Sequence, residues 1–293
     1  MRPIYQNTVI QIDIAEGACF LSCANCTRHI GHHRNPGFMS LETIAAAIDS
    51  LEGFSGRIGC MGGEPTLHPR FSDVLALFRR KIPDKAKREF WTSGWKWATY
   101  KDEIFETFDR NRIAFNSHTQ ANGKHQPLLV AIEEVVDDPE LRKLLIDNCP
   151  FQARWSASIT SRGAYFCEIA ASMGQLFGIP GWPVEPGWWK KTPAEFQDQV
   201  EQFCGKCSGA LPLPAYSDGQ GGRLGPTKDV ISPGNVERLK KMGSPKVARG
   251  HYEVWDRKLS AEDIDRLRSG WQPRSFRSFI AYSPEDYHAA SQG

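Results

Sequence analysis

Apolar positions follow two alternating periods along the first half of the chain. Residues 8–14 alternate apolar and polar side chains, which is the period of a half-buried strand. Residues 41–51 instead carry apolar side chains at helical spacing, and Ser40 precedes them as a helix N-cap. Further strands are predicted at 57–61, 89–92 and 112–116, and further helices at 71–78, 100–108, 128–136 and 141–146. This alternation predicts an α/β fold with parallel strands joined by crossover helices, whose active site lies at the carboxyl ends of the strands.

The pattern changes after the last of these helices. Residues 151–158 are predicted to form one more strand, and residues 163–167 are predicted to return beside it as a hairpin. The capping box at 192–195, with proline at the first helical position, predicts a helix over 196–203. Beyond it we expect a loop-rich extension with one helix at 260–268.

Composition narrows the class of protein. The chain has 293 residues, with 36 Lys and Arg against 34 Asp and Glu, so the formal net charge is only +2 and no basic surface for nucleic acid is expected. No run of 18 apolar residues occurs and the N-terminus lacks the apolar core of a signal peptide, so we expect no membrane partner. Eight cysteines without a secretory signal indicate metal ligation in a reducing compartment, and we expect a cytoplasmic protein.

Three cysteines, Cys19, Cys23 and Cys26, follow the first predicted strand at the spacing C-x3-C-x2-C. We call them the first cysteine group. Three thiolates in one short segment can hold three corners of a four-iron, four-sulfur cluster and leave one iron open to an outside ligand, which indicates chemistry at that iron. A structural zinc site usually has four ligands, and a disulfide requires an extracellular context that the chain does not show.

A second motif, Gly62-Gly63-Glu64-Pro65, follows the next predicted strand. Together with the first cysteine group, it resembles the signature of the radical S-adenosylmethionine superfamily. The resemblance implies a partial (β/α)6 barrel, a cluster whose open iron binds S-adenosylmethionine, and contact of the motif with the methionine ammonium through backbone carbonyls and Glu64. It also implies that Ser93 and Ser117, at the ends of two later strands, contact the methionine carboxylate or the ribose. The sequence departs from the superfamily at Asn25, where an aromatic residue commonly stacks near the adenine.

The second cysteine group comprises Cys149, Cys167, Cys204 and Cys207. Four thiolates from separated segments form a complete tetrahedral set, which suits either zinc or a second four-iron, four-sulfur cluster. The spacing from Cys149 through Gly163 to Cys167 resembles the opening of the SPASM and twitch auxiliary-cluster domains. The total of four is similar to the twitch layout of the deoxy-scyllo-inosamine dehydrogenases, which implies two four-iron, four-sulfur clusters in all.

The resemblance also implies how the chain divides and what it does. The parts are a radical S-adenosylmethionine barrel at 1–158, a twitch region at 159–212 and a C-terminal extension at 213–293. The function is that of an enzyme whose 5'-deoxyadenosyl radical removes a hydrogen atom from a sugar or cyclitol carbon, with an external one-electron reductant such as flavodoxin or ferredoxin. We expect a dehydrogenase; the alternatives are an epimerase, a peptide-modifying maturase or, in another class, an iron-sulfur electron carrier or a zinc-stabilised interaction module.

Cys60 is the cysteine that remains outside both groups. It has the strand parity of Gly62 and Glu64, so its side chain is expected to face the barrel interior, where a thiol can donate a hydrogen atom to a substrate radical. The alternative is a small buried apolar residue. A trio of histidines after the first cysteine group is expected to form a polar loop that covers the cluster, in preference to a metal site.

Overall fold

The computed structural model describes residues 1–115, 125–214 and 228–270. Its main sheet has seven strands in the order β5-β4-β3-β1-β6-β7, with the short β2 paired to β1. The strands are β1 Val9–Glu16, β2 Gly37–Phe38, β3 Arg57–Gly62, β4 Arg88–Thr92, β5 Ile113–Phe115, β6 Ala157–Thr160 and β7 Gly163–Tyr165. Each of the four strands predicted before residue 150 is confirmed.

Five of these strands run parallel, from β5 at one edge through β4, β3 and β1 to β6. β7 then returns antiparallel to β6, as the hairpin prediction required. The described residues therefore form an open, mostly parallel sheet with helices, in which five of the six expected parallel strands are present. Because β1 lies inside the sheet, the loop that follows it emerges at the middle of the carboxyl edge.

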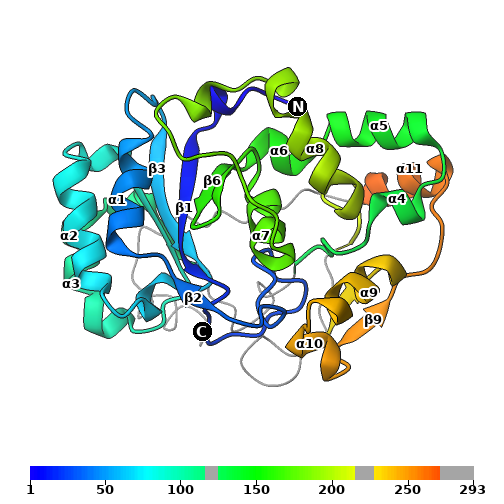
Figure 1. Cartoon of the computed structure of the whole chain (residues 1–293), viewed down its shortest axis with the longest axis horizontal. Coiled ribbons are helices and arrows are strands. Elements are labelled where there is room, and N and C mark those ends of the chain that lie inside the picture. Colours follow the sequence, from blue (N-terminus) through cyan, green and yellow to red (C-terminus); the bar gives the residue numbers. More distant parts are fainter. Residues whose placement is uncertain (116–124, 215–227, 271–293) are drawn as a thin grey trace.

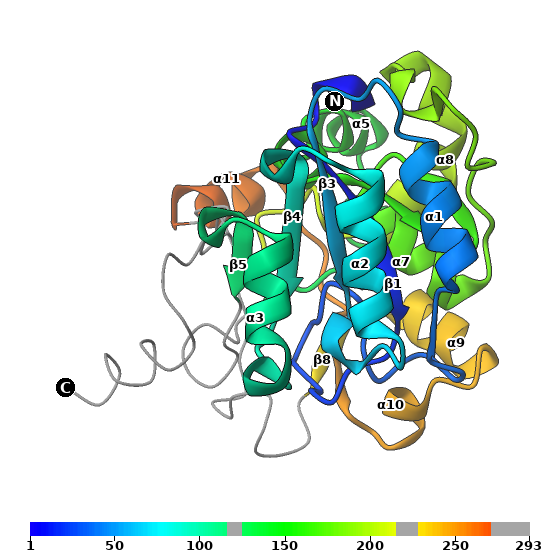
Figure 2. The same cartoon turned by 90° about the vertical axis from the view of Figure 1, so that its left-hand side faces the viewer.

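Helices alternate with the strands along the chain and pack against the sheet. Figures 1 and 2 show α1, α2 and α3 side by side on one face, and Figure 1 shows α6, α7 and α8 near β6, toward the other end of the sheet. The helices of this part are α1 Leu41–Asp49, α2 Phe71–Lys81, α3 Trp97–Thr107, α4 Ile132–Val135, α5 Pro139–Asp147, α6 Pro150–Arg154, α7 Glu168–Phe177 and α8 Gln197–Phe203. Ser40 caps α1 as predicted, because its side chain accepts a hydrogen bond from the main-chain N–H of Thr43.

The two faces of the sheet differ in polarity. On the helix side, Cys60 lies between Ile12 and Phe90 in the strand register, and the Phe90 ring packs 5.7 Å from Phe71 of α2. Residues of the other parity face the opposite way, and they include several buried polar side chains: Gln11, Asp13, Glu89 and Ser158. One face of the sheet is thus an apolar core, while the other is a buried polar layer.

The prediction of a strand over 151–158 is wrong for its first half. Residues 150–154 form α6, and only Ala157–Thr160 is extended. Pro150 occupies the first helical position, where its fixed φ favours the helix and its missing N–H costs nothing. The expected boundary between barrel and twitch region at 158/159 also falls inside β6, and β7 belongs to the same sheet.

The C-terminal extension has more regular structure than expected. Besides the predicted helix, now α11 Ala261–Gly270, it contains β8 Asp229–Ile231, α9 Pro233–Lys241, α10 Pro245–Ala248 and β9 Tyr252–Val254. β8 and β9 pair in parallel across α9 and α10. These strands have three residues each, which is too short for a readable period. Figure 1 shows α9 and α10, in yellow and orange, beside the blue loop that follows β1.

The helices in the described ranges are short. The longest described helices, α2 and α3, have 11 residues each, whereas a bilayer span takes about 20 apolar residues. No helix in the described ranges is therefore capable of crossing a membrane.

Candidate active site

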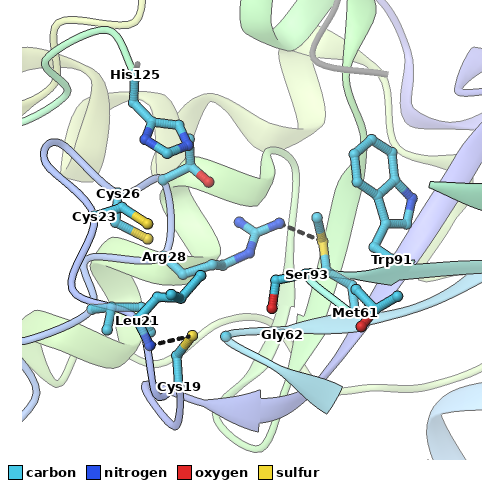
Figure 3. Close-up of a pocket in the computed structure, with 14 residues that line it drawn as sticks. Cys19, Leu21, Cys23, Cys26, Arg28, Met61, Gly62, Trp91, Ser93 and His125 are labelled. Carbon is cyan, nitrogen blue, oxygen red and sulfur yellow. Dashed lines mark hydrogen bonds between the residues drawn. The ribbon is translucent and has the colours of Figure 1, made fainter. Parts of the chain in front are cut away.

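A cavity at the carboxyl edge of the sheet gathers residues from distant parts of the chain (Figure 3). All three members of the first cysteine group line it, together with Gly62, Gly63 and Ser93. The other lining residues are Leu21, Thr27, Arg28, Ile30, Met61, Trp91, Thr92 and His125. The structure thus brings together most of the residues that the sequence assigned to cluster and cofactor, and it does so at the edge where parallel sheets place their sites.

The first cysteine group lies on the loop of residues 17–36, hereafter the cysteine loop, which joins β1 to β2. Burial raises the pKa of the Cys19 thiol to about 12 and also raises the pKa values of Cys23 and Cys26. Protonated thiols are poor ligands, so these sulfurs need a nearby positive charge to become thiolates. Bound iron supplies such charge, and three soft donors around one cavity fit an iron-sulfur cluster.

The Gly62-Gly63 segment packs directly against the start of the cysteine loop. The main-chain N–H of Gly63 donates to Ala15 O at 2.8 Å, and that of Glu64 donates to Ala18 O at 2.9 Å. A Cβ atom on Gly63 would lie 2.3 Å from Ala18 O, so only glycine permits this approach. The two motifs recognised in the sequence are therefore held next to each other by backbone hydrogen bonds.

Glu64 lies beneath this turn and its carboxylate is fully engaged by the protein. Its Oε1 accepts hydrogen bonds from Thr66 N, Thr66 Oγ1 and Thr92 Oγ1, at 3.1, 2.7 and 2.8 Å. Its Oε2 accepts from Ser93 N at 2.7 Å and from Ser93 Oγ. Since a carboxylate has about four acceptor positions, this one has none left for an ammonium group in this arrangement.

Glu64 therefore has a different role from the expected contact with the methionine ammonium. Glu64 fixes the ends of β3 and β4 relative to each other and holds Ser93 at the cavity wall. Pro65 follows as the first residue of a short 3-10 helix that Glu64 caps, and it is buried. Backbone carbonyls of the Gly62-Gly63 segment remain as acceptors for a cation. Ser117 lies outside the described residues.

The second cysteine group converges from three separate segments. Cys149 and Cys167 precede the first residues of α6 and α7, and Cys204 and Cys207 flank a single 3-10 turn after α8. The thiol of Cys204 interacts electrostatically with the other three, and burial raises its pKa. A Cβ atom on Gly209 would lie 3.4 Å from Cys207 Sγ and 3.6 Å from Cys149 Sγ, so both sulfurs lie next to Gly209.

The donors around this group suit thiolate ligands of either zinc or an iron-sulfur cluster. Among the described residues, no group of three Cys, His, Asp or Glu side chains is placed to hold a single metal ion. The N–H groups of Ile169 and Ala170 point at Cys167 and lower the pKa of its thiol, against the larger rise caused by burial. Such donors favour thiolate ligands.

Arg28 connects the surroundings of the two groups. Its guanidinium forms an ion pair with Glu168, donates to Glu168 O at 3.1 Å, and reaches Met61 Sδ at 2.6 Å (Figure 3). Arg28 lies two residues after Cys26, and Glu168 directly follows Cys167. A buried ion pair therefore joins the cysteine loop to the second cysteine group.

Cys60 does not reach the cavity, and the expectation that it faces the barrel interior is wrong. It is fully buried on the helix side between Ile12 and Phe90. The parity itself holds: burial and then the charge of Glu64 raise the pKa of the Cys60 thiol, so the two side chains lie on the same side. The cavity is lined by Met61, which has the opposite parity. The face that Cys60 shares with Glu64 is therefore the helix side of the sheet and not the barrel interior.

The three histidines lie in the cysteine loop, each with its own partner. His29 Nδ1 is 2.7 Å from Ser172 Oγ, and His33 Nε2 is 3.0 Å from Arg28 O. His32 contacts Ser244 Oγ and Asp229 Oδ2 at 2.8 and 2.7 Å. His29 and His32 thus fasten the loop to other segments, while His33 bonds within it, which agrees with a polar covering loop.

Sequence reasoning missed eight residues that line the cavity, among them Arg28, Met61, Trp91 and His125. For Trp91 a signal existed, because it has the parity of Glu89 on a predicted strand. Arg28 and His125 carry no local signal, because their positions depend on Glu168 and on the Ala24 carbonyl, 140 and 101 residues away.

Comparison with known proteins gives only distant likenesses. The chain matches no protein-family model and no curated protein. A crystal structure of BtrN in complex with AdoMet and 2-DOIA is similar over 68% of this chain and 88% of that chain, with 16% identity and a TM-score of 0.40. SeMet BtrN in an open conformation is similar over 75% and 94%, with 13% identity and a TM-score of 0.37. Likeness of this degree carries no argument, so the case for function rests on the site.

Proposed function

We propose that the chain is a radical S-adenosylmethionine enzyme that oxidises a hydroxyl-bearing carbon of a sugar or cyclitol. The observation that carries the proposal is the convergence of the first cysteine group, the Gly62-Gly63 turn and Ser93 on one cavity. When bound, the cluster and S-adenosylmethionine supply a 5'-deoxyadenosyl radical that removes a hydrogen atom from the carbon, and a cluster in the second cysteine group accepts the remaining electron.

The first role of the protein's own residues is to position the methionine moiety of the cofactor. Ser93, held by Glu64, presents a hydroxyl at the cavity wall, and the carbonyls of the Gly62-Gly63 turn offer acceptors beside the cysteine loop. The carbonyls suit the ammonium group of the methionine moiety. Ser93 Oγ donates its proton to Glu64, so it can serve the cofactor only as an acceptor, for the ammonium or for a ribose hydroxyl. The ion pair of Arg28 with Glu168 closes the wall toward the second cysteine group.

The polar layer on the cavity side of the sheet supports a hydroxyl-rich substrate. Four buried atoms there have no hydrogen-bond partner among the described residues: Gln11 Oε1, Asp13 Oδ1, Arg28 Nε and Ser158 Oγ. Leaving such an atom unpaired costs about 1–3 kcal/mol. Arg28 lines the cavity, whereas the other three lie behind its wall. A hydroxyl-rich ligand offers such a layer donors and acceptors, and an apolar ligand does not.

Asp13 lies behind the cavity wall, 3.7 Å from Nε of Arg28, so the proton that leaves the hydroxyl group has to be relayed to it. Burial raises its pKa to about 7, although the nearby charge of Arg28 opposes the rise. A carboxyl group with a pKa near neutrality can exchange a proton at physiological pH. With one hydrogen atom, one electron and one proton assigned, the alcohol carbon becomes a ketone.

The structure favours a dehydrogenase over an epimerase that uses Cys60. An epimerase must return a hydrogen atom to the substrate radical, and Cys60 is the one thiol outside the two cysteine groups. Its burial on the helix side separates it from the cavity.

The test is an anaerobic reaction of the reduced protein with S-adenosylmethionine and a panel of sugars and cyclitols in deuterated water. We expect a product two mass units lighter than its substrate, formed equally well by Cys60→Ala. A product of unchanged skeleton that contains one solvent deuterium, and that Cys60→Ala fails to form, would overturn the assignment.

A further inference from the structure

The cysteine loop is fastened to the C-terminal extension by buried charged groups. Lys246 of α10 is fully buried, and its ammonium donates to Cys23 O at 3.1 Å and to Asp229 Oδ1 at 2.8 Å. Its main-chain N–H donates to Gly31 O at 3.0 Å. A buried lysine is rare unless it is paired, and here its partners are the carbonyl of a cluster cysteine and a carboxylate.

Asp229, the first residue of β8, holds the same loop at two further points. Its Oδ1 accepts from the main-chain N–H of Asn25 at 2.5 Å, and its Oδ2 lies 2.7 Å from His32 Nε2. Asn25 has a φ of 51° and accepts from Val230 N at 2.9 Å through its side-chain oxygen. Asn25 is the position where the superfamily commonly has an aromatic residue, so here that position is used to fix the loop.

The carboxylate of Asp229 is held ionised. Burial by itself raises the pKa of Asp229, but the hydrogen bond from His32 and the charge of Lys246 outweigh it and hold the pKa at about 2. The Lys246 ammonium contacts Cys23 O, and Asp229 contacts the N–H of Asn25 between Cys23 and Cys26. Both charged groups therefore lie directly beside the segment that carries these two sulfurs.

We propose that Lys246 and Asp229 form a clamp that sets both the shape of the cysteine loop and the reduction potential of the cluster it holds. This inference rests on the proposed function, because it requires a cluster on the first cysteine group. An added electron is stabilised by the nearby ammonium of Lys246 and disfavoured by the carboxylate of Asp229. Lys246 and Asp229 act as positioning and tuning residues, since neither contacts the cavity.

The experiment is a redox titration of the anaerobically reconstituted full chain, followed through the electron paramagnetic resonance signal that changes when S-adenosylmethionine is added. Lys246→Met should lower the ratio of reduced to oxidised cluster about tenfold at a fixed potential, which is about 59 mV for one electron. Asp229→Asn should shift the potential in the opposite direction. Lys246→Arg keeps the charge and should restore the wild-type value.

Lys240→Met is the matched control, because Lys240 lies in the same segment but forms an exposed ion pair with Glu237. It should leave the potential and the iron content unchanged. Equal potentials in wild type, Lys246→Met and Asp229→Asn, or shifts of the same sign in both variants, would overturn the clamp. If Lys246→Met does not fold, the direction of the Asp229→Asn shift decides. Wild-type protein that binds no cluster would instead refute the proposed function.

Discussion

The first cysteine group lies on one loop, whereas the second comes from three segments that meet at helix ends. The shape of that loop depends on Asp229 and Lys246, some 200 residues further along the chain. The second group depends on helix termini that lie next to its own cysteines. Only the first group lines the cavity with Ser93 and the Gly62-Gly63 turn.

Under the proposed function, this difference would allow one chain to hold two similar clusters for different purposes. A site with three ligands on a cavity leaves one iron for a cofactor. A site with four ligands is complete and can exchange electrons without binding anything else. Arg28 and Glu168 lie between the two groups, so in the proposed reaction the electron would cross a buried ion pair on its way to the second group.

The largest effect is expected from removal of the first cysteine group. Replacing Cys19, Cys23 and Cys26 with Ala should abolish 5'-deoxyadenosine formation, because no open iron remains for the cofactor. Iron analysis of the variant should show about half the wild-type content, retained by the second group. Zinc in place of the remaining iron would contradict the assignment of a second cluster.

Removing the second group should separate cofactor cleavage from oxidation. In Cys204→Ala, 5'-deoxyadenosine should still form, but the oxidised product should be lost because the substrate radical has no electron acceptor. Chromatography of both products from one reaction gives their ratio. If the ratio in Cys204→Ala equals the wild-type ratio, the second group is not the acceptor.

A pH dependence tests the polar layer of the cavity. The pKa of Asp13 is raised from 3.8 to about 7, so between these values the folded protein binds more protons than the unfolded chain. The contribution of Asp13 to stability is therefore lost as the pH rises through this window, by at most about 1.4 kcal/mol per pH unit.

Asp13→Asn removes this slope. In chemical denaturation at about pH 5.5 and about pH 7, the wild type should lose stability relative to Asp13→Asn as the pH rises. Identical pH dependence in the two proteins would show that Asp13 ionises normally.

The smallest effect is expected at Cys60. Cys60→Ala leaves a small void between Ile12 and Phe90 and should lower the free energy of unfolding by about 1 kcal/mol. The ratio of oxidised product to 5'-deoxyadenosine should stay at the wild-type value. A fall in that ratio would show that Cys60 takes part in the reaction.

Local signals predicted much of the fold and of the site. The strands before residue 150, the cap at Ser40 and the capping box at 192–195 all depend on residues a few positions apart, and all are confirmed. The cysteine loop and the Gly62-Gly63 turn meet because consecutive parallel strands end at the same edge. The placement of Ser93 follows from the same rule.

The rest depends on distant or irregular features. Cys60 shares its face with Glu64, but this is the helix side of the sheet, and strand parity alone does not tell which face borders the cavity. The role of Glu64 follows from hydrogen bonds with three hydroxyl groups, and no spacing in the sequence predicts these contacts: Thr66, Thr92 and Ser93. The proposed clamp of Asp229 and Lys246 joins segments that are far apart in the sequence, so no local pattern predicts it.

The most direct test of the central claim is reduction of the anaerobically reconstituted protein with dithionite in the presence of S-adenosylmethionine. We predict that wild-type protein releases 5'-deoxyadenosine and methionine, and that Cys23→Ala releases neither. A wild-type protein that binds iron at the first cysteine group and still leaves S-adenosylmethionine intact would contradict the account.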